Sequence, residues 1–390
     1  MNNPVVELVG LHSKILVEWF ESIVYPIWST KGFDPASGLF HENLTRTYEP
    51  INGTRRSMVQ ARQIYCLTAL LELGTHSSRA RSTELKQKIS SALARYIEVY
   101  QLESGAFSFG VDDRLVRNPG QDLYAQSFAL FALARGFEIS KDPVLEASAL
   151  KLLNYLMTER LLANGGFSEI ENGKSVCRSN PHMHLFEAAV EWLTVSKTDA
   201  WKNLNTLLYE HLEKKILNGR DMIAEEFDEN WNPILNDEGA YFFEPGHHFE
   251  WAWLVARYAD LSKTPVGELP AKLYASANRL GLQTGSEIVL DQVWSNGKVK
   301  AASARFWPQG ERIKAAAYLA RLSSTDRDGY VRDCLRSTAN MLDYLQPLDA
   351  GLWTDTRTAA GEMIYANAKG SSLYHIVGAI VELRSLAKCL

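Results

Sequence analysis

The chain has 390 residues, of which 46% are hydrophobic and 22% charged, and this ordinary globular composition excludes a disordered, collagen-like or coiled-coil protein. Its 41 Lys and Arg and 46 Asp and Glu give a net charge of −5. No basic run is present that could neutralise a row of phosphates, so we expect no nucleic-acid partner.

The N-terminal residues 1–20 lack the basic start, apolar centre and small-residue cleavage site of a signal peptide. No later stretch approaches 18 uncharged apolar residues, so we expect no membrane span. The four cysteines lie far apart and show no paired spacing, which suits a reducing compartment. These features predict a cytoplasmic protein.

Apolar spacing along the chain predicts one helix after another, and strand alternation is scarce. Residues 83–100 show the pattern most clearly, with apolar side chains every four residues at Leu85, Ile89, Leu93 and Ile97. Further along, Asp142 followed by Pro143 predicts a helix start, and the prolines at 265 and 270 mark the change from one helix to the next. About a dozen helices fit the chain.

Short turns that combine glycine with an aromatic residue return at intervals close to sixty residues or a multiple of sixty. The clear examples end at Phe40, Phe107, Phe167 and Trp353. Two weaker ones, around residues 223–231 and 288–294, fill the longest gap. The chain therefore contains six units of two helices each.

Six helical hairpins without a linker or a shift in composition predict an all-α fold, a closed (α/α)6 barrel. We expect residues 1–390 to form a single domain. The structural alternative is an open solenoid of the HEAT type, but its repeats are shorter, about 40–47 residues.

Polar residues recur with the same period, so equivalent units would bring them to one mouth of the barrel. Their separations are 62, 60, 63, 64 and 64 residues. The six positions are Arg62, Tyr124, His184, His247, Glu311 and His375. Two of these residues also have a structural alternative. Arg62 could form an ion pair with a neighbouring helix, and Tyr124 could be a buried phenol that a neighbour satisfies.

Two of the ring histidines begin the same local pattern, H-x-F-E, which places Glu187 three residues after His184 and Glu250 three residues after His247. Residues three apart share a helical face, so each histidine has a carboxylate neighbour. His182 and His248 point elsewhere on their helices, and either a structural or a supporting role fits them.

A metal site is not expected. Residues two apart on a helix, such as His182 and His184, face different sides, and the spacing of helical zinc ligands is absent. Phosphate-binding glycine loops and a G-x-S-x-G nucleophile motif are also missing. We therefore expect no cofactor.

At these motifs the sequence resembles the N-acylglucosamine 2-epimerase superfamily, whose members are sugar epimerases and aldose–ketose isomerases built on an (α/α)6 barrel. The resemblance covers nearly the whole chain. It is carried by RRSMVQARQIY (55–65), DLYAQSFALFALA (122–134), RSNPHMHLFEA (178–188), PGHHFEWAWL (245–254), ARFWPQGERIKA (304–315) and SLYHI (372–376).

Within the superfamily, NPHMHLFEA and PGHHFEWAWL look most like the D-mannose isomerase branch. The resemblance implies that His247 and His375 form the acid/base pair. It also implies that the sugar hydroxyls are held by Arg62, Asn180, His184 and Glu250, and that Trp307 packs on the sugar. Tyr124 and Glu311 complete the set of expected substrate-binding residues. The segment NAKGSSLYH before His375 departs from many relatives, which bears on the choice of substrate.

Imidazole suits the proposed chemistry because its pKa near 6.5 lets it accept and return a proton at neutral pH. In the mechanism we expect, His375 removes the C2 proton of an opened aldose and gives a cis-enediolate, while His247 assists proton transfer between O1 and O2. Arg62 stabilises the enediolate charge, and Glu250 orients His247 or a hydroxyl. The reaction converts D-mannose to D-fructose, or D-lyxose to D-xylulose, without metal.

The main alternative is a 2-epimerase acting on mannose and glucose, on N-acylhexosamines or on cellobiose. A glycoside hydrolase or lyase would instead need a pair of carboxylates across the sugar bond. A noncatalytic carbohydrate-binding protein is a third class. A phosphosugar would need basic residues such as Arg305 and Lys369. We expect a monosaccharide as the ligand and a monomer or homodimer.

Overall fold

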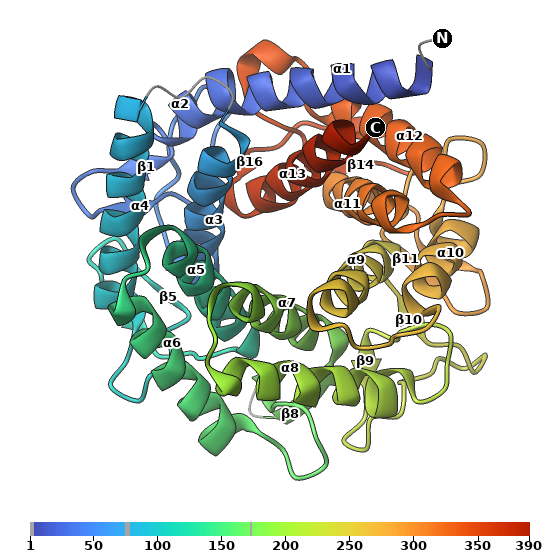
Figure 1. The fold of residues 1–390 in the computed structure, drawn as a ribbon, viewed down its shortest axis with the longest axis horizontal. Coiled ribbons are helices and arrows are strands. Elements are labelled where there is room, and N and C mark those ends of the chain that lie inside the picture. Colours follow the sequence, from blue (N-terminus) through green and yellow to red (C-terminus); the bar gives the residue numbers. More distant parts are fainter. Residues whose placement is uncertain (1–3, 75–78, 172–173) are drawn as a thin grey trace. The chain divides into compact units, whose positions relative to one another are not determined.

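The structure is a computed structural model that describes residues 4–74, 79–171 and 174–390. Its contacts divide the chain into two compact units. The central unit comprises Phe33–Glu42 and Pro50–Asn236, and the terminal unit comprises Met1–Gly32, Asn43–Glu49 and Asp237–Leu390. Each unit is built from helical hairpins joined by short strands (Figure 1).

The central unit contains three hairpins in two layers. One layer holds α3, α5 and α7, which pack side by side, and each is followed in the chain by its partner in the other layer. The hairpins are α3 (Ser57–Leu73) with α4 (Arg79–Tyr100), α5 (Leu123–Ser140) with α6 (Pro143–Tyr155), and α7 (Ser179–Val195) with α8 (Asp199–His211).

The terminal unit repeats this arrangement, with α9, α11 and α13 in one layer. Its third hairpin pairs the last helix of the chain with the first, because α13 packs on α1. The hairpins are α9 (Pro245–Ser262) with α10 (Leu269–Gly281), α11 (Phe306–Leu322) with α12 (Arg327–Tyr344), and α13 (Leu373–Cys389) with α1 (Pro4–Trp19); the short α2 (Tyr25–Trp28) follows α1.

Short antiparallel strands connect the hairpins and lead into the helices of the first layer. In the central unit they are β1 (Phe33–Asp34), β2 (Leu39–Phe40), β4 (Arg55–Arg56), β5 (Gly110–Val111), β6 (Arg117–Asn118), β7 (Glu169–Glu171), β8 (Lys174–Arg178) and β9 (Glu226–Phe227). In the terminal unit they are β3 (Asn43–Leu44), β10 (Phe242–Phe243), β11 (Gln292–Trp294), β12 (Val299–Ala301), β13 (Ala304–Arg305), β14 (Thr356–Arg357), β15 (Met363–Ile364) and β16 (Ala368–Lys369).

The two layers differ in how their helices are buried. In α4 the predicted apolar stripe is buried at Leu85, Ile89 and Leu93 and half-buried at Ile97, while the intervening residues are mostly exposed. In α5 almost every residue from Leu123 to Gly136 is buried. A helix buried on all sides carries a continuous apolar sequence, so the polar residues in such a helix need a specific partner or a role.

The glycine-aromatic turns dock onto the first turn of the following buried helix. The backbone N–H of the turn residue donates to a helix side chain, and the geometry is nearly the same in three hairpins of the central unit and one of the terminal unit. The pairs are Phe40 N to Gln60 Oε1 at 2.7 Å, Phe107 N to Gln126 Oε1 at 2.7 Å, Phe167 N to His182 Nε2 at 2.8 Å and Val289 N to Gln309 Oε1 at 2.9 Å.

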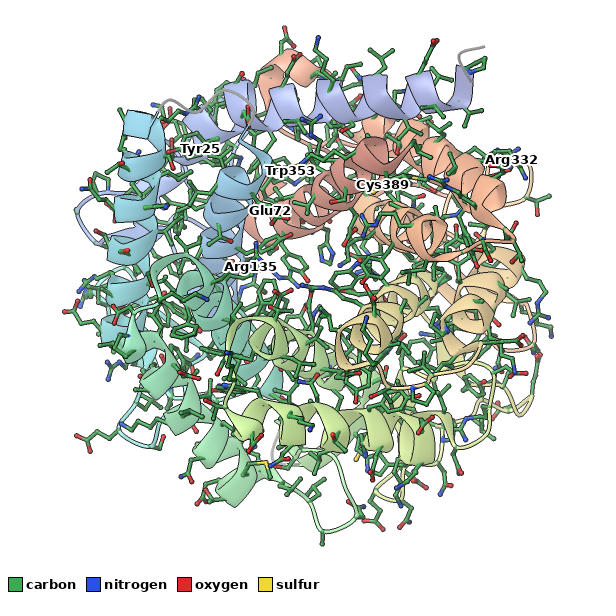
Figure 2. All side chains as sticks on the ribbon, in the orientation of Figure 1. Tyr25, Glu72, Arg135, Arg332, Trp353 and Cys389 are labelled. Atoms are coloured by element: carbon green, nitrogen blue, oxygen red, sulfur yellow. The ribbon has the colours of Figure 1, made fainter. Side chains whose placement is uncertain are left out.

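Within the central unit, Arg135 of α5 ties three helices together. Its guanidinium forms ion pairs with Glu72 of α3 at 3.0 Å, with Glu138 of α5 at 2.7 Å and with Glu191 of α7 at 3.5 Å; Figure 2 labels Arg135 and Glu72. Burial lowers the pKa of Arg135, but the three carboxylates outweigh burial and raise it. Arg135 thus fixes the spacing of the helices that carry Arg62, Tyr124 and His184.

The sequence predicted the helical content well. In the part of the chain described, twelve helices have 13 residues or more, so the all-α prediction is confirmed. Asp142 caps α6 by accepting a hydrogen bond from the Val144 N–H, as expected. No helix among the described residues is long and apolar enough to cross a membrane. The single domain over residues 1–390 stays a prediction.

Candidate active site

In the terminal unit, the first turns of α9, α11 and α13 bring three aromatic rings together. His247 lies at the start of α9, Trp307 at the start of α11 and His375 at the start of α13. The ring centroid of Trp307 is 5.0 Å from that of His247 and 5.3 Å from that of His375. The two histidines of the predicted acid/base pair therefore contact the same tryptophan.

His375 is anchored by a carboxylate from the neighbouring helix. Its Nδ1 lies 2.7 Å from Glu311 Oε1, and the Glu311 side chain is completely buried. An ionised carboxylate only accepts hydrogen bonds, so the proton of a neutral His375 ring resides on Nδ1. Nε2 is then the basic nitrogen, which is the state a general base requires.

Glu311 also contacts a buried lysine. Lys314 Nζ lies 2.8 Å from Glu311 Oε2 and 3.8 Å from Glu250 Oε1. One ligand atom of each of Glu250, Glu311 and His375 lies within 4.8 Å of the other two, which is a spacing that could hold a metal ion. Because the Lys314 ammonium already supplies a positive charge to both carboxylates, these residues fit a metal poorly. The absence of a metal stays a prediction.

His247 lies next to a network of charged residues at the start of α9. Its backbone N–H donates to the carbonyl oxygen of Glu244 at 3.0 Å. The Glu244 carboxylate accepts from Arg305 Nη2 at 2.9 Å, and Arg305 Nε donates to Asp291 at 3.0 Å. Burial raises the pKa of Glu244, but the positive charges of His247 and Arg305 outweigh burial and lower it. Glu244 therefore carries a negative charge next to two basic side chains.

In the central unit, Arg62, Tyr124 and His184 also come together. Arg62 Nη2 donates to Tyr124 Oη at 2.6 Å, and the guanidinium lies 4.3 Å from the centre of the Phe128 ring. The His184 ring packs against both aromatic side chains, 5.0 Å from Tyr124 and 4.6 Å from Phe128. The three predicted residues thus form one contact network, and Phe128 is a member that the sequence reading missed.

The contact that the H-x-F-E pattern predicts between His184 and Glu187 is present. His184 Nδ1 lies 3.0 Å from Glu187 Oε2, and both side chains are buried. Asn180 lies one turn earlier on α7, and its Oδ1 is buried without a hydrogen-bond partner among the described residues. A buried amide oxygen without a partner is costly, so it is available to a ligand hydroxyl.

The two histidines beside the ring positions have structural contacts. His182 Nε2 accepts from the Phe167 N–H, and its Nδ1 donates to the Arg178 carbonyl at 2.8 Å. Burial lowers the pKa of His182 to about 4 and that of His248 to about 3. Both rings are therefore neutral at pH 7. His182 occupies the place that Gln126 and Gln309 take in other hairpins.

The segment before His375 is held by Asp355. Lys369 Nζ lies 2.7 Å from Asp355 Oδ2, and Ser372 Oγ donates to Asp355 Oδ1 at 3.0 Å. Lys369 and Arg305 are the basic residues that a phosphosugar would need, and each has a carboxylate partner in the structure. The loop is consequently organised around an internal ion pair.

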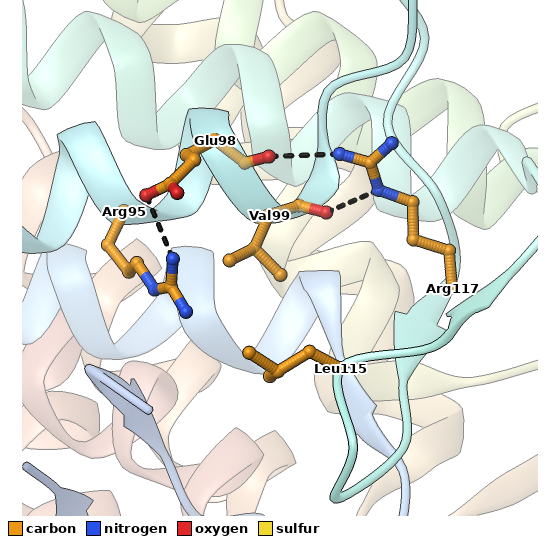
Figure 3. A pocket seen from close by; sticks show the side chains of 5 residues that line it. All are labelled: Arg95, Glu98, Val99, Leu115 and Arg117. Carbon is orange, nitrogen blue, oxygen red and sulfur yellow. Dashed lines mark hydrogen bonds and ion pairs between the residues drawn. The ribbon is translucent and has the colours of Figure 1, made fainter. Parts of the chain in front are cut away.

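A surface hollow of about 420 Å³ lies elsewhere in the central unit, between α4 and the loop that joins β5 to β6 (Figure 3). Arg117 donates to the carbonyl oxygens of Val99 and Glu98, and Arg95 forms an ion pair with Glu98 at 2.8 Å. Since both guanidinium groups are engaged within the protein, the hollow offers no strong anion site.

The family model for N-acylglucosamine 2-epimerase (GlcNAc 2-epimerase) matches residues 38–379. The chain belongs to this family. It is also 31% identical, over 389 residues, to a protein of Rhizobium meliloti named mannose-6-phosphate isomerase; the match covers 97% of this chain and 98% of the relative. The protein is thus an enzyme of a superfamily of sugar isomerases and epimerases.

Solved structures show the same fold. The cellobiose 2-epimerase of Spirochaeta thermophila matches with a TM-score of 0.82 and 19% identity over 98% of each chain. A D-mannose isomerase matches with a TM-score of 0.80 and 16% identity over 97% of each chain. These likenesses confirm the predicted (α/α)6-barrel fold.

Proposed function

We propose that the protein is an aldose–ketose isomerase that interconverts D-mannose and D-fructose through a cis-enediolate. The observation that carries this proposal is the terminal-unit site, in which Trp307 contacts two histidines and Glu311 holds Nδ1 of His375. A base with a defined basic nitrogen beside an apolar ring suits removal of a proton next to a sugar carbonyl.

The two histidines have different electrostatic surroundings, which supports a division of roles. His375 is the base that takes the proton from C2 and returns it to C1. His247 interacts electrostatically with Glu244 at the start of α9, and we assign to His247 the role of the acid that assists proton transfer between O1 and O2. We further propose that Arg62, Tyr124, Asn180, His184 and Glu250 bind sugar oxygens and that Trp307 packs on the sugar.

Mannose without a phosphate is the substrate we favour. Arg305 is paired with Glu244 and Asp291, and Lys369 is paired with Asp355, so nearby carboxylates already offset the positive charge that would attract a phosphate. The second candidate is mannose 6-phosphate, because the relative from Rhizobium meliloti carries the name mannose-6-phosphate isomerase.

The test is a comparison of kcat/KM for mannose, mannose 6-phosphate, N-acetylmannosamine and cellobiose with chelator-treated protein. We expect mannose to have the highest value and fructose to be its first product. A higher value for mannose 6-phosphate would favour the second candidate. Glucose as the first product from mannose would make the protein a 2-epimerase instead.

The same proposal includes four further points: turnover without a metal, a monosaccharide as the ligand, a monomer or homodimer, and a cytoplasmic location.

A further inference from the structure

Lys314 is an unusual residue for its position, because its side chain is 4% exposed. Lysine is seldom buried unless its charge is compensated. Here Glu311 compensates it at 2.8 Å and Glu250 lies 3.8 Å away. The arrangement places one ammonium beside two buried carboxylates.

Aromatic side chains hold the ammonium in place. Lys314 Nζ lies 4.0 Å from the centre of the Trp253 ring and 5.6 Å from that of Tyr374. The Trp253 ring is itself fixed, since its Nε1 donates to Glu382 at 2.8 Å. Such cation–π contacts strengthen when water is excluded. Lys314 is therefore a fixed charge of this site.

The other carboxylate oxygen of Glu311, Oε1, contacts His375. Glu311 Oε1 lies 2.7 Å from His375 Nδ1, so the same carboxylate links the lysine to the imidazole. Within the described part of the terminal unit, the charged groups near the ring include Glu311 and Lys314 from α11 and Glu250 from α9. Tyr374 of α13 contacts the ring, and His247 of α9 contacts the same Trp307. Without Lys314, two carboxylates would face the imidazole and favour its protonated form.

We propose that Lys314 is a positioning residue: its ammonium balances the charge of Glu311, so that Glu311 orients His375 and fixes its protonated nitrogen without converting the ring to imidazolium. The assignment of His375 as the base rests on the proposed function. The charge balance itself does not depend on which sugar is bound.

The test is an NMR titration of isotopically labelled histidine in the full chain, with the His375 signal identified by its loss in His375→Ala. We expect Lys314→Met to raise the titration midpoint of His375 by about one pH unit or more. The reason is that the positive charge of Lys314, which disfavours a protonated imidazole nearby, is removed. Glu311→Gln should lower the midpoint. The Lys314→Met/Glu311→Gln double variant removes both charges, so its midpoint should lie above that of Glu311→Gln and below that of Lys314→Met.

Lys263→Met is the matched control. Lys263 also pairs with an acid three residues earlier, Asp260 at 3.3 Å, but its side chain is 80% exposed. This variant should leave the His375 midpoint unchanged. An unchanged midpoint in Lys314→Met would overturn the proposal, because it would leave Lys314 a packing role only.

If Lys314→Met does not fold, the double variant provides the test, because it leaves no unbalanced Glu311 charge in the interior. A midpoint in the double variant that lies above that of Glu311→Gln supports the proposal, whereas a midpoint equal to that of Glu311→Gln overturns it. The titration needs no substrate. Failure of the wild-type protein to convert any sugar would therefore count against the proposed function and leave the result for Lys314 intact.

Discussion

His184 in the central unit and His375 in the terminal unit each contact a buried carboxylate through Nδ1. The carboxylate that contacts His184 comes from the same helix, and the one that contacts His375 comes from a neighbouring helix. Glu187 lies one turn after His184 on the same helix, at 3.0 Å. Glu311 reaches His375 from the neighbouring helix at 2.7 Å, and Lys314 in turn contacts Glu311. A helix packing contact therefore positions His375, whereas local geometry positions His184.

The difference has a chemical consequence. A carboxylate with its own ammonium partner orients an imidazole while adding little to the stability of imidazolium. His375 is consequently suited to accept a proton and give it back. His184, held within a network of Arg62 and aromatic rings, is suited to bind a hydroxyl.

The largest effect is expected from His375→Ala. Removing a general base costs about 10²–10⁴-fold in rate, so kcat for mannose should fall by that factor while the protein stays folded. Proton NMR of product formation and circular dichroism measure the two quantities. A variant with more than a tenth of wild-type kcat would assign the base elsewhere.

Arg62→Met tests the central-unit network. The guanidinium donates to Tyr124 and lies over Phe128, and loss of a charged hydrogen bond costs about 1.5–3 kcal/mol. We expect kcat/KM for mannose to fall about 10–100-fold. The rate under saturating mannose separates a loss of binding from a loss of enediolate stabilisation. A kcat/KM within a factor of two of the wild-type value would leave Arg62 a structural residue.

A pair of isosteric variants tests the comparison directly. Glu311→Gln leaves the Lys314 ammonium without its closest counter-charge, so kcat should fall about tenfold, as expected for one unit of basicity at His375, and the acid limb of the pH–rate profile should move to lower pH. Glu187→Gln should act chiefly on KM, with a cost of about 1 kcal/mol.

Steady-state kinetics from pH 5 to 9 distinguish the two variants. Equal effects on kcat from both would contradict the separate roles assigned to the two histidines.

The smallest effect concerns stability. Burial lowers the pKa of His182 in the folded protein to about 4, below the unfolded value of about 6.5. Between these values the unfolded chain binds more protons, so stability is full above about pH 6.5 and is lost as the pH falls toward 4. Gln takes the same place in three other hairpins. His182→Gln should therefore reduce the loss between pH 7 and 5 by about 1–2 kcal/mol.

Urea unfolding at pH 7 and pH 5 measures this difference. An equal loss of stability in wild type and His182→Gln would show that other groups, such as His211 and His248, determine the acid sensitivity.

Much of the fold follows from the sequence because helices and turns are local. The caps, the apolar stripe of α4 and the glycine-aromatic turns were visible as patterns, and the ring period selected residues that do come together within each unit. The H-x-F-E motif also predicted the His184–Glu187 contact, since both residues lie on one helix.

The contacts between helices could not be predicted in this way. The period of about sixty residues places Glu311 and His375 in one ring, but it does not predict that Glu311 holds Nδ1 of His375, and no spacing links Arg62 to Phe128. Lys314 did leave a local signal, because it follows Glu311 by three residues, but an exposed ion pair has the same spacing. Burial distinguishes the two, and burial depends on how the helices pack.

The central claim is that His375 moves a proton between C1 and C2 of a hexose. Its most direct test is proton NMR of D-mannose in D2O with chelator-treated protein. We predict that wild-type protein forms fructose at least about a hundredfold faster than His375→Ala. Deuterium should appear at C1 to the extent that the proton on His375 exchanges with solvent before it is delivered. Folded wild-type protein that forms no fructose, or fructose formed as fast by His375→Ala, would contradict the account.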